Sequence, residues 1–167
     1  MSRSMFDDLE VSQSEAIGAA DSRTLRLAAH ALTQDDLHGL IRYQEAFLVH
    51  LEQAPSEPHA LTTAHQLGLK SSGLEVKVVE LGNSMLRAYC GQRWTARRLR
   101  TRLAELERQP DGISAEKAGK ARDELRRIED LEPLARRYGA ETLALLRARE
   151  DVLVDLHTRV TRLLSRG

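Results

Sequence analysis

The sequence predicts an all-α protein, an antiparallel up-and-down bundle of four or five helices with a long central helix. Leu, Ala, Arg and Glu dominate the chain, and aromatic residues make up only 4% of its 167 residues, a composition that favours helices over sheets. Apolar residues recur at helical spacing through most of the chain, and no segment alternates as a strand does. We expect one domain over residues 22–167, preceded by a flexible N-terminal tail over residues 1–21.

The central helix is expected over residues 73–108 and carries two apolar stripes. At 100° per residue one face collects Leu74, Val78, Leu81, Met85, Ala88, Ala96, Leu99, Leu103 and Leu106, and a roughly opposite face collects Val79, Leu86, Cys90 and Trp94. A helix with apolar residues on two sides packs on two sides. This helix is therefore expected to be the spine of the domain.

Capping and breaking residues define the elements before the spine. Residues 22–32 are rich in Ala and Leu and are compatible with a short helix, and Thr33 is placed to cap a helix over 34–53. A second helix is expected over 57–67, with its end at Gly68 and the Ser-Ser-Gly cluster that follows. Ser72 and Glu75 stand at capping-box spacing, which predicts that they open the spine.

Turn residues divide the chain after the spine. The Gln-Pro-Asp-Gly turn at 109–112 precedes a helix expected over 113–131, with Ser114 as its cap. Pro133 predicts a kink or break near 130–133, and Gly139 is a second weak point before a last helix over 140–164. The predicted core contains Leu40, Leu81, Met85, Leu99, Leu125, Ile128, Leu153 and Leu156.

Charge and cysteine content limit which partners and which cellular compartment we expect for the protein. Basic and acidic residues number 25 each, so no overall field draws the chain to nucleic acid or membrane. No apolar run approaches the roughly 18 residues of a membrane span, and no signal peptide is evident, so we expect a cytoplasmic protein, with a removed signal or lipoprotein leader left open. The single Cys90 excludes an internal disulfide, and the preference for arginine over lysine is typical of a GC-rich bacterial genome.

No catalytic, metal or cofactor motif stands out in the sequence. The six histidines form no HExxH or paired ExxH pattern, and the nearest approach, Asp35 with His38, is more simply a solvated pair in the first turn of a helix. Cys90 has no histidine base close in sequence, and no glycine-rich loop joins a strand to a helix. We therefore expect a non-enzymatic protein with no cofactor and no metal.

An acid-free stretch from Leu81 to Ala104 supports one alternative function. It holds six arginines, which we call the arginine ridge: Arg87, Arg93, Arg97, Arg98, Arg100 and Arg102. Six phosphate contacts would give useful non-specific affinity, and Trp94 could stack on a base, so the ridge suggests a small helical nucleic-acid-binding subunit. The competing interpretation is that acidic segments, such as Glu124 to Glu132 or the N-terminal tail, neutralise the ridge within the fold.

The leading functional hypothesis is a bacterial helical interaction protein, which acts as an adaptor, regulator or inhibitor. Cys90, Trp94, Arg97 and Arg98 lie at i, i+3 and i+4 spacings on the spine and form its predicted partner-binding surface. The partner would be another protein or a second copy of this chain. Either another helix covers Trp94, or Trp94 is an exposed aromatic anchor flanked by arginines, a combination enriched at binding hot spots.

Overall fold

The chain is helical throughout the part that the computed structural model describes, residues 32–54 and 56–166. The helices are α2 (Gln34–Gln53), α3 (Ala60–Ser72), α4 (Val76–Glu107), α5 (Gly112–Glu129), α6 (Glu132–Tyr138), α7 (Ala140–Ala148) and α8 (Glu150–Ser165). Within these ranges no strand occurs, so the all-α prediction is confirmed. The tail expected over 1–21 and nearly all of the short helix expected over 22–32 lie outside the described residues.

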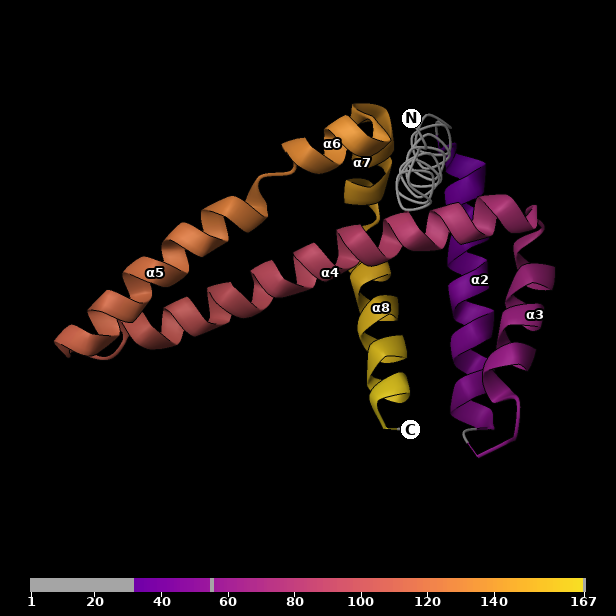
Figure 1. The fold of residues 1–167 in the computed structure, drawn as a ribbon, viewed down its shortest axis with the longest axis horizontal. Coiled ribbons are helices and arrows are strands. Elements are labelled where there is room, and N and C mark those ends of the chain that lie inside the picture. The colour runs from indigo at the N-terminus through magenta and orange to yellow at the C-terminus, as the bar shows by residue number, and fades with distance from the viewer. Residues whose placement is uncertain (1–31, 55, 167) are drawn as a thin grey trace, which may run out of the picture.

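Two helical hairpins and one further helix set the shape of the molecule (Figure 1). α2 and α3 pair side by side, α4 crosses α2 and α8, and its far end pairs with α5. α6 and α7 then lead the chain back to α8, which packs on α4 and α2. The finer expectation, an up-and-down order of all helices, is not confirmed, although both hairpins follow it locally.

Several helix ends lie where the sequence predicts them. The side chain of Thr33 accepts a hydrogen bond from the Asp36 amide, and the Asp36 carboxylate accepts one from the Thr33 amide, each at 3.1 Å. This capping box starts α2, which has the predicted bounds of 34–53. The predicted break before Pro133 is also present, since Pro133 lies in the first turn of α6, where its missing N–H is not needed. Gly139, at φ +92°, separates α6 from α7.

Two predicted caps are wrong. Ser72 belongs to α3, where its hydroxyl donates to the Leu69 carbonyl and accepts from the Leu74 amide, so it is not available to cap α4. Glu75 occupies the N-cap of α4 without a side-chain bond. At the start of α5 the cap is Asp111, whose carboxylate accepts from the amide of Ser114 at 2.6 Å. An aspartate at the end of a turn caps as well as a serine, and its earlier position decides the register.

One predicted helix break is wrong, and one break in the structure was not predicted. Gly68 does not end α3 but lies buried inside it, where an added Cβ would come within 2.6 Å of the Tyr43 ring. The missing side chain of Gly68 allows α3 to pack closely against Tyr43 of α2. The last predicted helix, 140–164, is instead two helices that meet at Arg149, whose backbone leaves the helical region at φ −120° and ψ 20°. No Gly or Pro marks this break.

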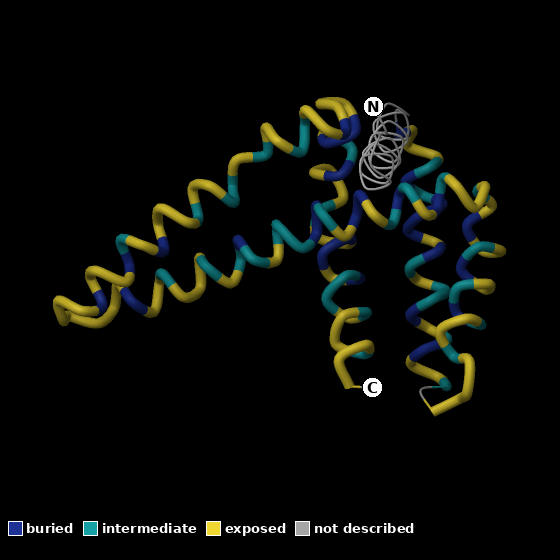
Figure 2. Tube along the Cα trace, in the orientation of Figure 1, coloured by how far each residue is buried: buried dark blue, intermediate teal, exposed yellow. Residues whose placement is uncertain are grey.

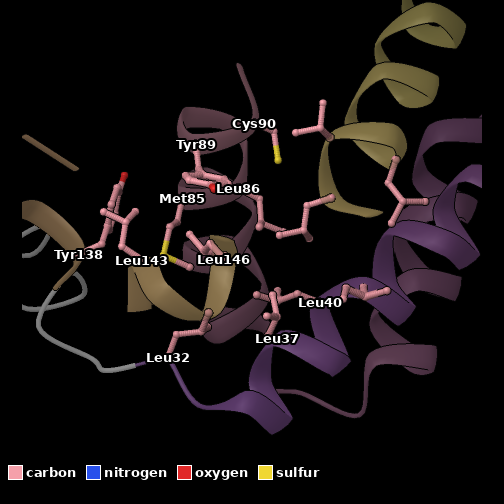
Figure 3. Packing of buried hydrophobic residues seen from close by; sticks show 14 of the residues in the cluster. Leu32, Leu37, Leu40, Met85, Leu86, Tyr89, Cys90, Tyr138, Leu143 and Leu146 are labelled. Carbon is pink, nitrogen blue, oxygen red and sulfur yellow. The ribbon is translucent and has the colours of Figure 1, made fainter. Parts of the chain in front are cut away.

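The core gathers where α4 crosses the other helices. On one side of α4, Met85 lies beside Leu146, with Leu143 and Tyr138 next to them (Figure 3). Leu40, Met85, Leu153 and Leu156 are buried as predicted, whereas Leu81, Leu99, Leu125 and Ile128 are only half-buried. Both stripes of α4 contribute buried side chains, and Val79, Leu86 and Cys90 from the second stripe are among them.

The end of α4 and all of α5 form a projection that we call the arm, residues 98–129. Its seam continues the first stripe of α4 and ends on Leu106, and α5 supplies Ser114, Ala118 and Ala121 to it. Along α5, Ser114, Ala118, Ala121, Leu125 and Ile128 repeat at alternating spacings of four and three, the pattern of a coiled-coil seam. The outer faces of the arm are exposed (Figure 2). The arm thus packs along one seam only.

Candidate binding surfaces

Four arginines of the arginine ridge have acidic partners within the fold. The Arg93 Nε atom lies 3.0 Å from Glu150, and Arg97 contacts both Glu150 and Asp151, the latter at 2.9 Å. Arg100 pairs with Glu129 on α5, and Arg102 lies 3.9 Å from Glu105 in an exposed pair. Most of the ridge is therefore neutralised locally, mainly by acidic residues at the start of α8.

Glu150 is the centre of this charge network. Besides the two arginines it accepts a hydrogen bond from the Tyr89 hydroxyl at 2.8 Å. Burial works against ionisation of Glu150, but the bond from Tyr89 and the charges of Arg93 and Arg97 outweigh it and lower the pKa of this carboxyl. Burial, reinforced by the negative Glu150, in turn raises the pKa of Tyr89, so its hydroxyl stays a donor. The network joins the start of α8 to the middle of α4.

Arg87 and Arg98 are different, because no acidic side chain of the described residues pairs with them. The Arg98 guanidinium lies over the Trp94 ring, 4.8 Å from its centroid, a cation–π geometry. Trp94 itself is 37% exposed, so the described helices cover only part of it. An aromatic ring and a positive charge without an acidic partner among the described residues therefore meet at this point of α4.

Cys90 does not belong to the surface that Trp94 and Arg98 form. Cys90 is buried in the core, where a partner protein could not contact it. Its assignment to the predicted partner-binding surface was therefore wrong. Burial, together with the nearby Glu150, raises the pKa of the Cys90 thiol to about 12. A thiol this weakly acidic behaves as a small hydrophobe rather than a nucleophile.

A groove that the sequence did not reveal lies between α2, α4 and α8. It has a volume of about 370 Å³ and an apolar floor that includes Leu86, Leu153 and Leu156. Tyr43, Asn83 and Arg87 lie along its polar wall. The one sequence signal was Asn83, a polar residue that interrupts the second apolar stripe of α4 between Val79 and Leu86.

Two further kinds of site, a metal centre and a membrane span, were searched for in the part of the chain described. Across residues 32–54 and 56–166, no three His, Cys, Asp or Glu side chains gather as a metal site would require. Nor is any described helix long and apolar enough to cross a lipid bilayer.

Comparisons with known protein families, with curated proteins and with solved structures gave no match. The chemistry of the surfaces described above is therefore the basis for assigning a function.

Proposed function

We propose that this chain is a non-enzymatic protein–protein interaction module, an adaptor, regulator or inhibitor of bacterial type. Its partner-binding surface is Trp94 with Arg98, at the base of the arm, flanked by Arg97. The observation that carries the proposal is the Arg98 guanidinium held over a half-exposed tryptophan ring, with no acidic partner among the described residues. Tryptophan and arginine are the residue types most enriched at interface hot spots.

The charge of this surface indicates the chemistry of the partner. Arg98 offers a positive charge beside an apolar ring, while Arg97 is already engaged by Glu150 and Asp151. A protein segment that places an apolar side chain on Trp94 and a carboxylate on Arg98 would satisfy both groups. The partner is therefore an acidic, partly apolar surface of another protein.

The alternative function, nucleic-acid binding through the arginine ridge, has less support. Arg93, Arg97, Arg100 and Arg102 already contact carboxylates, so phosphate contacts would have to replace these ion pairs. Fewer free arginines mean fewer released counterions and weaker non-specific binding. This alternative is kept as an outcome of the experiment that follows.

Site-specific crosslinking followed by reconstitution tests the proposal. A photo-reactive phenylalanine analogue is placed at position 101, where the exposed Thr101 lies one helical turn from Arg98 and leaves Trp94 and Arg98 in place. As a control, it is placed at position 113, where Ile113 is 70% exposed at the tip of the arm. The captured protein is then purified and its affinity measured. Trp94→Ala and Arg98→Ala should each weaken binding by about 30-fold, which is hot-spot size, while Ile113→Ala leaves it unchanged.

Two results would overturn the proposal. One is a purified partner whose affinity is the same for Trp94→Ala, Arg98→Ala and the original chain. The other is crosslinking at position 101 to nucleic acid alone, with affinity that falls steeply as salt rises, which would assign the ridge function instead.

A further inference from the structure

The groove between α2, α4 and α8 has the properties of a small-molecule site rather than of a flat contact surface. Its volume of about 370 Å³ lies within the roughly 300–1,000 Å³ typical of ligand pockets. Sites of this kind in helical proteins lie between packed helices and combine an apolar lining with a few converging polar groups. The groove shows both features, and they are separated in space.

The polar groups converge on the wall that α2 and α4 form. The Tyr43 hydroxyl lies 2.6 Å from Nδ1 of His65, and the Gln44 amide donates to the Asn83 side chain at 2.9 Å. Tyr43, Asn83 and Arg87 all line the groove, and burial raises the pKa of Tyr43, so its hydroxyl stays protonated. Tyr43, Asn83 and Arg87 thus share one part of the groove.

Arg87 supplies the positive charge of this cluster, and no acidic side chain of the described residues pairs with it. Glu80, the acidic residue of the lining, also has no ion pair among the described residues. It lies one helical turn before Asn83 but seven positions before Arg87, about 10 Å along the helix axis, so an anion is favoured at the Arg87 end of the wall. Burial lowers the pKa of His157 on α8, so that imidazole is neutral near pH 7. The wall therefore favours a single negative charge at Arg87.

The opposite part of the groove is apolar and continues beyond it. Phe47, Leu156, Val160 and Leu164 line it, and Leu164 also lines a second hollow with Leu51, Leu61 and Leu163. From Leu153 to Leu164, α8 advances about 16 Å. An apolar track of that length starts beside a positively charged wall and ends at the open edge near Leu61.

We propose that this groove binds a monomeric single-chain carboxylate of the fatty-acid type. Its carboxylate meets Arg87 and Asn83, and its acyl chain lies over Leu156, Val160 and Leu164. An arginine fork matches a carboxylate in geometry as well as in charge, and an unbranched acyl chain matches the apolar lining that continues along α8. This site is separate from the Trp94 surface, so each proposal can fail without the other.

Displacement of a fluorescent polyunsaturated fatty acid, parinaric acid, tests the assignment on the full chain. Dodecanoate, dodecanol and dodecylammonium, each below its micelle concentration, compete with the probe. Dodecanoate should bind at least tenfold more tightly than either of the others. Because each buried methylene adds hydrophobic free energy, tetradecanoate should bind about tenfold more tightly than dodecanoate.

Variants locate the two ends of the ligand. Arg87→Gln should weaken dodecanoate binding about tenfold or more and leave dodecanol unchanged, whereas Leu164→Glu should weaken both. Both residues are exposed, so the fold tolerates the changes, as circular dichroism and melting will verify. Arg102→Gln, an exposed arginine of the arm, is the matched control and should change neither affinity.

Each contrary outcome overturns the assignment. Equal affinity for dodecanoate and dodecanol, or an unchanged affinity in Arg87→Gln, would exclude a carboxylate site at this wall. Binding to phosphatidylglycerol vesicles without binding of monomeric dodecanoate would assign a membrane surface instead. Displacement of the probe by an amphipathic helical peptide but by no fatty acid would assign a protein ligand.

Discussion

The two halves of α4 belong to different environments, although one continuous helix contains both. Residues 76–97 pack against α2 and α8, and their Leu86, Cys90 and Met85 belong to the core cluster, where Met85 lies beside Leu146 of α7 (Figure 3). Among the described helices, residues 98–107 pack along one seam against α5. We call the described helices outside the arm the body: α2, α3, α4 up to residue 97, α6, α7 and α8. The body therefore owes its stability to a shared core, whereas the arm depends on a single two-helix interface.

The largest expected effect comes from leucines matched in type and burial. Leu40, which is fully buried, lies in the body, and Leu106, which is 5% exposed, lies in the arm. Leu40→Ala should lower the free energy of unfolding by about 2–5 kcal/mol, because it leaves a cavity in the shared core. Leu106→Ala should lower it by less than half as much, since the arm can open without the body. Urea unfolding monitored by circular dichroism measures both, and equal losses would contradict the comparison.

Two glycines, Gly82 in the body and Gly119 in the arm, test the same comparison. An added Cβ at Gly82 would lie 2.5 Å from two Leu40 methyl carbons, whereas nothing lies within 4 Å of one added at Gly119 in α5. Gly82→Ala should therefore destabilise by about 1–3 kcal/mol through overpacking. Gly119→Ala should stabilise by about 0.5–1 kcal/mol because alanine is the better helix former. Thermal melting checks both signs, and stabilisation by Gly82→Ala would refute the close crossing of α2 and α4.

The charge network of Glu150 joins body and arm base and gives a pH dependence. Since the folded pKa of Glu150 lies below its ordinary value of 4.5, the carboxylate stabilises the fold above pH 4.5. That contribution disappears as the pH falls through the lower, folded pKa. Glu150→Gln should remove this part of the acid sensitivity and cost about 1–3 kcal/mol at pH 7, because Arg93 loses its carboxylate.

Asp151→Asn is the control for the Glu150 prediction. Among the described residues Asp151 pairs with Arg97 alone, and its side chain is almost wholly exposed, so its loss should cost about 0.5 kcal/mol or less. Unfolding curves at pH 3 to 7 compare the two variants. Equal costs at pH 7 would mean that Glu150 has no central role.

A small effect on stability is also expected at Trp94. This residue is 37% exposed, and the flexible Arg98 side chain lies over its ring, so Trp94→Ala should change the free energy of unfolding by about 1 kcal/mol or less. In the isolated protein, iodide should quench its fluorescence, and more strongly than caesium does, because Arg98 attracts the anion. Emission that resists both quenchers would show that the ring is covered and would remove it from the partner-binding surface.

Local sequence signals predicted much of the fold but not how the helices meet. Thr33, Pro133 and Gly139 act through their own backbone and neighbours three or four residues away, so their effects are visible in the sequence. The break at Arg149 has no such signal. Leu99 and Leu125 are half-buried because no third helix of the described residues packs against the arm, which periodicity cannot show.

The candidate surfaces also combine features that the local sequence predicts with features that only the fold creates. The pairing of Trp94 with Arg98 follows from i, i+4 spacing and could be predicted. Which arginines stay free could not, because Glu150 is 57 residues from Arg93 and Glu129 is 29 residues from Arg100. The groove needs three helices from distant parts of the chain, so only its interrupting Asn83 was visible beforehand.

Native-state hydrogen exchange along α4 tests most directly whether the arm is a separate unit from the body. Amides at residues 99–107 and throughout α5 should exchange through a common local opening with a free energy several kcal/mol below that of global unfolding. Amides from Met85 to Cys90 should exchange only through global unfolding. Equal protection along the whole of α4, with the arm and the body opening together, would contradict this account.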